Sequence, residues 1–388
     1  MINVIITGIT SFLTDVSSEM FYPLISLYLV ALGSGPEIIG VIEGIAESLA
    51  SLLKVFSGHI SDKIGKRKPL AILGYSSSTI GKVLMFLASS WPGVLLGRIT
   101  DRFGKGLRTA PRDALIAESV KEKRGAAFGL HRTLDTLGAF TGVLIAIWFM
   151  RRYELESIKG STEVLKNYLP AFKSLLLLSL IPAILGIVVL FFARETGGGK
   201  LAKKLVFKWK ELPSKLKGFL IVTFIFTLGN SSNQFLLLRA KTIGFSVVSV
   251  LLLYLTYNAV YALFSYPAGR LSDRIGRKWI IVIGYLTYGL VYILFSLTKN
   301  PLFIYILFGI YGIYMGLTEG VSKALVSDIA PKDLKATLIG LHATLVGIGL
   351  FPASLIAGIL WQRVSPVATF MFGGAMGIIA AIGMILVL

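Results

Sequence analysis

Eight charged residues lie within one apolar segment, residues 93–118. The seven before its last residue, Glu118, are the strongest candidates for chemistry in this chain: Arg98, Asp101, Arg102, Lys105, Arg108, Arg112 and Asp113. On a helix, Arg98, Arg102 and Lys105 share a face at spacings i, i+4 and i+7, and Asp101 can pair with Arg98 or Lys105. A charge at the centre of a membrane helix costs roughly 2.5 to 3.5 kcal/mol even on the low scales. If this segment spans a membrane, its charged face must therefore line water or meet acids of other segments.

Carboxylates on three other apolar segments could meet these cations. Asp15 and Glu19 lie one helical turn apart, Glu43 and Glu47 form a similar pair, and Asp135 stands in a later segment. Asp15 lies about 18 Å from the nearer end of its segment at 1.5 Å per residue, close to mid-depth. A carboxylate there can take up and release a proton as its surroundings change. We expect Asp15 and Glu19 to carry protons, with Asp135 and Glu47 next in line; the alternative is a purely structural salt-bridge cluster.

The second half of the chain offers a polar and aromatic surface instead. Its candidate residues stand in three segments: Asn230, Asn233 and Gln234; Tyr254, Tyr257, Asn258 and Tyr261; Tyr311, Tyr314, Glu319 and Lys323. Tyrosines at helical spacing more often pack or form interfacial belts than bind ligands. If these segments do face a cavity, the site suits an amphipathic organic molecule better than a bare inorganic ion.

Composition identifies the kind of protein that must position these residues. The chain has 388 residues, of which 55% are hydrophobic and only 15% charged. Its mean hydropathy is +0.78. Apolar runs of about 20 residues, each long enough to cross a bilayer, recur along its length. These features exclude a soluble enzyme and indicate a polytopic membrane protein.

Other site types are excluded by what the chain lacks. It contains no cysteine and only three histidines, which rules out disulfides and thiolate sites and leaves too few scattered histidines for a zinc site. No segment has the G-x-x-x-x-G-K-[ST] pattern, so we expect no ATP consumption and no cofactor. The net charge of +19 would suggest nucleic acid in a soluble chain, but its placement between apolar segments makes it a topology signal and excludes a nucleic-acid partner.

Twelve spans are expected from the apolar windows: 4–32, 37–60, 70–90, 93–118, 125–149, 171–193, 218–241, 246–268, 279–298, 301–328, 335–361 and 366–388. The first carries Asp15 and Glu19 and has no cleavage site, so it is a retained helix and not a signal peptide. Residues 194–217, with three glycines and many lysines, divide the chain into domains 1–193 and 218–388. We interpret 194–217 as a cytoplasmic linker in which residues 205–209 could form an interfacial helix.

Lysines and arginines concentrate in the connections that follow the even-numbered spans. Positively charged loops stay in the cytoplasm, so both termini are expected there. The chain is thus predicted to be a multi-pass protein of the cell membrane, in contact with anionic lipid and monomeric.

The two halves are internal repeats. Residues 57–69, SGHISDKIGKRKP, align with 268–280, AGRLSDRIGRKWI, at an offset of 211, and GLHRTLDTLGAF from Gly129 aligns with GLHATLVGIGLF from Gly340 at the same offset. At an offset of 210, Glu118 lies over Asp328. Two six-helix halves in parallel order are typical of secondary transporters.

These residues resemble the major facilitator superfamily over the whole chain. Its signature G-x-x-x-D-R-x-G-R-R is matched by Gly58, Asp62, Gly65, Lys66 and Arg67, and again by Gly269, Asp273, Gly276, Arg277 and Lys278. The resemblance implies an all-α membrane protein with twelve transmembrane helices in two pseudo-symmetric six-helix bundles. It also implies an inner gate, latched in the outward-facing state by Asp62, Lys66 and Glu118 and by Asp273, Arg277 and Asp328. The glycines of the signature are expected to allow close helix approach and a tight turn.

A second likeness concerns the proton-coupled drug antiporters of this family. Their fourth helix has an arginine twenty residues before the gate acid, as Arg98 stands before Glu118, and that arginine is linked to proton coupling in the family. This chain departs from their pattern, because Asp101 and Arg102 replace a glutamine and a glycine, and the fifth helix has Gly138 and Gly142 but no Gly-Pro motif.

The sequence therefore predicts a secondary active transporter, not an enzyme, that moves a small organic solute by alternating access, with proton-coupled export as the leading hypothesis. Proton-coupled uptake of an organic or inorganic anion is the runner-up, because five basic residues lie along the fourth helix. Divalent metal transport and a non-transporting membrane sensor are the remaining alternatives. The expected partners are the solute, protons and the lipid bilayer.

Overall fold

Every secondary-structure element that the structure describes is a helix. The structure is a computed structural model that describes residues 2–120, 124–157, 164–196, 212–331 and 334–388. The helices divide into two compact units. Unit 1 comprises the described residues of 1–35 and 45–203, and unit 2 those of 36–44 and 204–388. The prediction of an all-α protein is confirmed.

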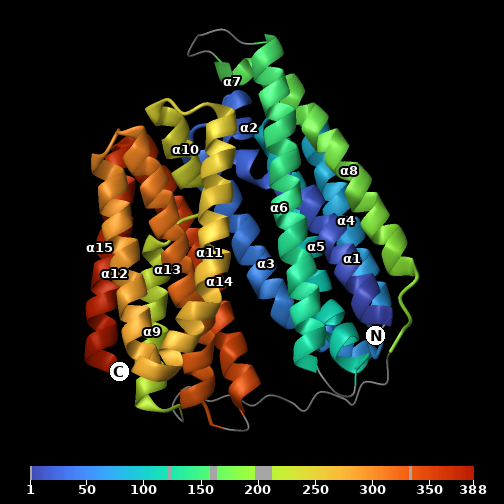
Figure 1. Ribbon diagram of the computed structural model, residues 1–388, viewed down its shortest axis with the longest axis vertical. Coiled ribbons are helices and arrows are strands. Elements are labelled where there is room, and N and C mark those ends of the chain that lie inside the picture. Colours follow the sequence, from blue (N-terminus) through green and yellow to red (C-terminus); the bar gives the residue numbers. More distant parts are fainter. Residues whose placement is uncertain (1, 121–123, 158–163, 197–211, 332–333) are drawn as a thin grey trace. The chain divides into compact units, whose positions relative to one another are not determined.

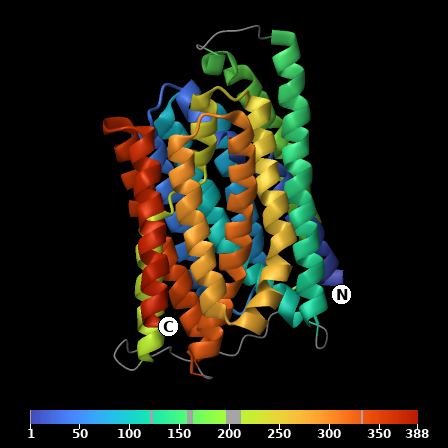
Figure 2. The same cartoon turned by 60° about the vertical axis from the view of Figure 1, so that its left-hand side comes forward.

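Unit 1 contains the helices of the first half of the chain, labelled in Figure 1. They are α1 (Ile2–Glu19), the 3-10 turn η1 (Tyr22–Leu24), α2 (Ile25–Ala31), α3 (Pro36–Ile64), α4 (Lys68–Leu87), α5 (Trp91–Glu118), α6 (Arg124–Ser157), α7 (Val164–Asn167) and α8 (Leu169–Phe191). The start of α3, residues 36–44, belongs to unit 2 although the rest of the helix belongs to unit 1. Helix α6, the long teal helix of Figure 2, runs eight residues past the predicted end of its span at 149.

Unit 2 contains the helices of the second half. They are α9 (Ser214–Gly229), α10 (Gln234–Ile243), α11 (Val247–Ile275), α12 (Arg277–Leu297), α13 (Pro301–Ile329), α14 (Lys335–Arg363) and α15 (Pro366–Val387). The interfacial helix expected at residues 205–209 lies outside the described residues.

Nine helices among the described residues are long and apolar enough to cross a membrane. The expected spans that fall short of this standard are α1, α3 and α5, and these are the ones that carry the candidate acids and cations. Their charged side chains lower the apolar content, so their polar faces must be turned away from lipid.

Two predicted continuous spans are broken at equivalent places. In unit 1 the first span ends its α-helix at Glu19 and resumes at Ile25, since Pro23 has no N–H to continue the hydrogen-bond ladder. In unit 2 the seventh span ends at Gly229 and resumes at Gln234 across the polar segment 230–233 (Figure 1). Interrupted helices in corresponding positions of two repeats are the best structural pointer to a transport site, because they free backbone groups at mid-depth.

Glycines bring α4 and α5 into close contact in unit 1. A Cβ atom added to Gly104 would lie 2.6 Å from the backbone nitrogen of Ser78, and one added to Gly81 would lie 2.6 Å from that of Asp101. Small residues at such crossings let helix backbones approach. This crossing sets the polar face of α4 directly against the charged face of α5.

Candidate functional site

The arginines of α5 meet an acid of α3, as the sequence predicts. In the folded chain, a nitrogen of Arg102 lies 2.9 Å from Oε1 of Glu47, and one of Arg98 lies 3.9 Å from the same oxygen. Asp101 lies 3.6 Å from Arg98 and 4.0 Å from Arg102. Both guanidinium groups also stand over the ring of Tyr22, at 5.6 and 5.2 Å, where α1 is interrupted. The predicted contact between the fourth helix and an acid of the second is confirmed; a role in binding or coupling stays a prediction.

Lys82 on α4 is a buried cation that the sequence analysis did not identify. Its side chain is 3% exposed, and its Nζ donates hydrogen bonds to Ser17 Oγ at 2.6 Å and Ser18 Oγ at 3.2 Å. These serines lie in the last turn of α1, just before the interruption. Lys82 therefore connects α4 to the helix break through neutral hydroxyl groups.

Arg108 on α5 is likewise held by neutral groups. One of its guanidinium nitrogens donates to Ser78 Oγ at 2.9 Å, and Ser78 Oγ donates to the carbonyl oxygen of Asp101 at 3.0 Å. The guanidinium carbon lies 4.4 Å from the ring centre of Tyr75. We call Lys82, Arg98, Asp101, Arg102, Arg108 and Glu47 the charge cluster.

Lys105 differs from its neighbours on α5 because it is exposed. The two arginines are buried against α3 and Tyr22, whereas Lys105 stands at the edge of the charge cluster. Its ammonium group acts electrostatically on both Glu47 and Asp15.

Asp15 of α1 and Asp135 of α6 lie within hydrogen-bonding reach of each other. Two carboxyl groups can share such a bond only while one of them carries a proton, which it donates to the other. Arg132 lies 3.1 Å from Oδ2 of Asp135, and Glu19 acts electrostatically on Asp15. Helices α1 and α6 thus bring together two of the predicted coupling acids.

A neutral polar group lies next to this carboxyl pair. Ser11 Oγ is 2.9 Å from Nε2 of His131 and 3.4 Å from the hydroxyl of Tyr75. Arg112 donates to Ser11 Oγ at 3.3 Å and pairs with Asp113 at 2.8 Å. The sequence aligns His131 with His342 of the second repeat, but the spacing of His131 does not indicate this contact.

Glu43 stands one helical turn before Glu47 on α3 and has a hydrogen-bond partner of its own. It is fully buried and accepts a hydrogen bond from Ser232 Oγ at 3.2 Å in the interruption between α9 and α10. Both residues belong to unit 2. The expectation that Glu43 and Glu47 serve one network with the cations of α5 stays a prediction.

The tyrosines of unit 2 pack against one another around the same interruption. Asn233 Nδ2 donates to the hydroxyl of Tyr257 at 3.2 Å, and the hydroxyl of Tyr311 donates to Asn233 Oδ1 at 2.7 Å. The hydroxyl of Tyr288 donates to the carbonyl oxygen of Gly229 at 2.7 Å. Tyr254 is buried and stacks edge-on against Tyr257, while Asn258 donates to the backbone of its own helix. Asn230 caps α9 through its backbone.

The gate motif of unit 1 uses a different cation from the one predicted. Arg67, and not Lys66, lies 3.0 Å from Oε1 of Glu118 and donates to Ser61 Oγ at 2.8 Å. Lys66 is exposed, and the side chain of Asp62 lies outside the part of the chain that the structure describes. Glu195 accepts from the backbone N–H groups of Arg67 and Lys68, which caps the start of α4.

In unit 2 the predicted ion cluster is present. Arg277 lies 2.8 Å from Asp273 and 2.7 Å from Asp328, and it donates to Ser272 Oγ at 2.7 Å. Arg67 and Arg277 therefore play equivalent parts, and the loop of unit 1 has one extra residue before its arginine. That extra residue shifts the repeat offset from 211 to 210 and caused the wrong pairing of Lys66 with Arg277.

The signature glycines end the two helices. Gly65 follows α3 with φ of 68°, and Gly276 follows α11 with φ of 94°, conformations that favour glycine. Close helix approach at the other two glycines is not observed: a Cβ on Gly58 would make an ordinary 3.4 Å contact, and one on Gly269 would meet no described atom within 4 Å.

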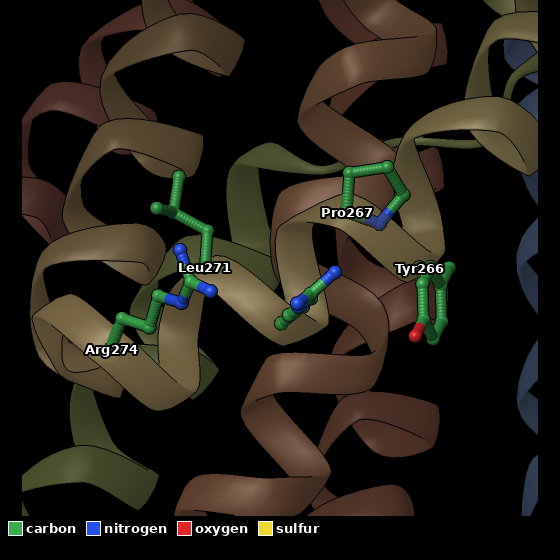
Figure 3. A pocket seen from close by; sticks show the side chains of 5 residues that line it. Tyr266, Pro267, Leu271 and Arg274 are labelled. Atoms are coloured by element: carbon green, nitrogen blue, oxygen red, sulfur yellow. The ribbon is translucent and has the colours of Figure 1, made fainter.

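A shallow pocket of about 300 Å³ lies on α11 near these gate residues (Figure 3). Tyr266, Pro267, Arg270, Leu271 and Arg274 line it. It lies near the end of the helix and away from the interruption of α9 and α10, so we do not assign it to the transported solute. No group of three His, Asp or Glu side chains in the described ranges is arranged to hold a metal ion.

Arg239 on α10 is a second buried cation that sequence reasoning missed. Its side chain is 8% exposed, and its Nε has no hydrogen-bond partner among the described residues. The apolar residues around Arg239 in the sequence predict a membrane span, but they do not predict which face of the helix is buried.

Comparison with known proteins gives a consistent picture. A family profile described as Major Facilitator Superfamily matches residues 7–217 and 219–388. An uncharacterised MFS-type transporter of Methanocaldococcus jannaschii is 37% identical over 388 residues, covering 98% of this chain and 93% of that protein. A Lactococcus lactis protein named as a homolog of the multi-drug resistance efflux pump PmrA is 24% identical over 394 residues, covering 95% and 92%. The crystal structure of the nucleoside transporter NupG matches with a TM-score of 0.78 at 13% identity, covering 100% and 99%, which is a likeness of fold.

Proposed function

Because the chain belongs to the major facilitator superfamily, whose members are transporters and not enzymes, we propose that it moves a small organic solute across the cell membrane by alternating access, coupled to protons. Both termini lie in the cytoplasm in this proposal, as the distribution of lysine and arginine indicates. The gate clusters of Arg67 with Glu118 and of Arg277 with Asp273 and Asp328 hold the cytoplasmic ends in the outward-facing state.

The observation that carries the coupling proposal is the carboxyl pair of Asp15 and Asp135. A shared proton is a group that can be bound on one side of a membrane and released on the other. Lys105 lies close enough to act on Asp15, so a solute that engages Lys105 changes the electrostatic field at the carboxyl pair. Proton binding and solute binding are thereby linked through one exposed side chain.

Export is the first candidate direction. It is supported by the likeness to the PmrA efflux pump homolog, which matches this chain along nearly its full length. Exchange of an outgoing solute for incoming protons is the form of export that an inward proton gradient can drive.

Uptake of an anion together with protons is the second candidate, and the basic residues of α4 and α5 favour it. An anion beside Asp15 favours the protonated form of the carboxyl pair, because it repels the ionised carboxylates. Anion and proton then bind together, as cotransport requires.

Purified protein in liposomes that enclose a pH-sensitive dye tests the proposal. A panel of organic anions, cations and neutral solutes is added under an imposed pH gradient, and solute-dependent proton movement is followed. We expect Asp15→Asn and Asp135→Asn to lose this signal at least tenfold while they retain solute exchange without a gradient. Glu37→Gln, whose carboxylate pairs with the exposed Arg363 at 3.2 Å, is the control and should behave as wild type. Undiminished gradient-driven accumulation by Asp15→Asn would show that the proton is carried elsewhere.

A further inference from the structure

Positive charge exceeds negative charge in the charge cluster. Its cations are Lys82, Arg98, Arg102 and Arg108, all at most 6% exposed, and its carboxylates are Asp101 and Glu47. Four cations against two carboxylates leave two positive charges without a counterpart inside the cluster.

The two carboxylates are already engaged by arginines. Glu47 contacts Arg102 and Arg98, and Asp101 contacts the same two side chains. Lys82 and Arg108 form no ion pair with a carboxylate in the described ranges: the hydrogen-bond partners of Lys82 are the hydroxyls of Ser17 and Ser18, and that of Arg108 is the hydroxyl of Ser78. Asp15, the next acid that acts on Lys82, is engaged with Asp135.

Excess buried charge is unfavourable in itself. Hydroxyl groups satisfy the hydrogen-bonding capacity of a cation but do not neutralise it, and removing an uncompensated ion from water is costly. A ligand that brings negative charge to the cluster lowers this cost, whereas a cationic ligand raises it. The cluster therefore selects ligands by the sign of their charge.

The cluster meets solvent along one edge. The side chain of Glu47 is 28% exposed and that of Asp101 12%, and Lys105, one turn along α5 from Arg102, is exposed. Lys105 forms no ion pair among the described side chains, so its ammonium group is available to an incoming group at this edge.

We propose that the transported solute is an organic anion whose carboxylate, sulfonate or phosphate binds Lys105 at this edge, beside Arg102. Lys82 and Arg108 do not touch the solute; they supply the positive potential that attracts it. The inference rests on the proposed transport function and adds the chemical class of its substrate. Of the two candidate directions, it favours cotransport of an anion with protons.

Thermal unfolding of the purified full-length protein tests the inference with three probes at equal ionic strength. Sodium malonate is the minimal dicarboxylate, sodium phosphate the inorganic anion, and tetraethylammonium chloride the organic cation. We expect malonate to raise the melting temperature saturably by about 2 to 4 °C or more, and tetraethylammonium to have no effect. A response to inorganic phosphate that equals that of malonate would show that the site binds any small anion, and it would overturn the assignment to an organic solute.

Three variants locate the response. Lys105→Gln removes an exposed side chain that holds no described residue in place, and it should abolish the malonate shift without changing the stability of the free protein. Lys82→Met should weaken the shift and leave the protein folded, because it strands no carboxylate. Lys323→Gln, an exposed lysine of α13 in unit 2, is the control and should keep the full shift.

Absence of any saturable anion effect, an equal shift in Lys105→Gln, or stabilisation by tetraethylammonium instead would overturn the inference. These results are separable from the proposed function. If anion binding fails while Asp15-dependent proton movement persists with another solute, the substrate class alone is wrong. If malonate binds as expected but no solute moves protons, the coupling proposal is wrong and the anion site remains.

Discussion

The fourth helix of each repeat shows where the two halves of the chain diverge. At the offset of 210 residues, α5 and α13 begin and end together, with Trp91 over Pro301 and Glu118 over Asp328. Between these ends five charged residues of α5 have uncharged counterparts in α13: Phe308 for Arg98, Tyr311 for Asp101, Gly312 for Arg102, Met315 for Lys105 and Thr318 for Arg108. We interpret the shared ends as parts of the common architecture, and we expect the divergent middle of α5 to carry the charge-dependent chemistry.

The same divergence appears on the third helix of each repeat. Lys82 of α4 corresponds to Tyr292 of α12, and Ser78 corresponds to Tyr288. Lys82 contacts the interruption after α1 through Ser17 and Ser18, whereas Tyr288 contacts the interruption after α9 through the carbonyl oxygen of Gly229. Both units stabilise a broken helix from the third helix of the repeat, at positions one turn apart, one with a cation and the other with a phenol.

Arg102→Met should show the largest effect on stability. The change leaves Glu47 without its nearest cation at 2.9 Å and removes one partner of Asp101. Breaking a buried pair by removing one partner costs about 3 kcal/mol or more of the free energy of unfolding. Denaturant titration in detergent micelles measures it.

The matched change in unit 2 is Lys323→Met. Its partner Glu319 lies 3.2 Å away, but both side chains are about half exposed. The expected loss is below about 1 kcal/mol. Equal losses for the two variants would contradict the view that unit 1 alone contains a buried charge cluster.

Gly104→Ala should come next in size. The new Cβ would lie 2.6 Å from the backbone nitrogen of Ser78, so α4 and α5 would have to separate, at a cost of about 1 to 3 kcal/mol. Gly309→Ala on α13 is the control, because no described atom lies within 4 Å of its added Cβ. That variant should gain up to about 1 kcal/mol from helix propensity. The melting temperatures of both variants, measured side by side, decide whether the close crossing is required.

The gate arginines should show the smallest difference. The Arg67 side chain is 6% exposed against a partly buried Glu118, whereas Arg277 is 22% exposed and both of its partner acids are more than half exposed. Arg67→Gln should therefore cost about 1.5 kcal/mol and Arg277→Gln about 0.5 kcal/mol. The same unfolding titration measures both, and a larger loss for Arg277→Gln would reverse the order proposed for the two gate clusters.

Much of the fold could be predicted from sequence because it depends on periodic signals. The apolar windows and the internal repeat identified the helices and their order, and the repeated signature located the Arg277 cluster. The contact of Arg98 and Arg102 with Glu47 followed from the cost of charge in a membrane, which requires an acid nearby.

The remaining features depend on contacts that no local pattern encodes. Lys82 and Arg239 stand alone in apolar segments, and only the packing of neighbouring helices shows that they are buried. An alignment that pairs Gly65 with Gly276 does not reveal the single extra residue before Arg67. The apolar composition of residues 4–32 and 218–241 predicted two continuous helices and not interrupted ones. Pro23 and the polar residues 230–233 are signals that could have revealed the interruptions.

The coupling account predicts a proton shared between Asp15 and Asp135. Detection of that proton tests the account most directly. Infrared difference spectroscopy of the purified protein across a pH titration detects the carbonyl stretch of a protonated carboxyl group. We predict one such band in the wild type that titrates, disappears in both Asp15→Asn and Asp135→Asn, and is unchanged in Glu319→Gln. Absence of a protonated-carboxyl band at every pH, or its persistence in both aspartate variants, would contradict the account.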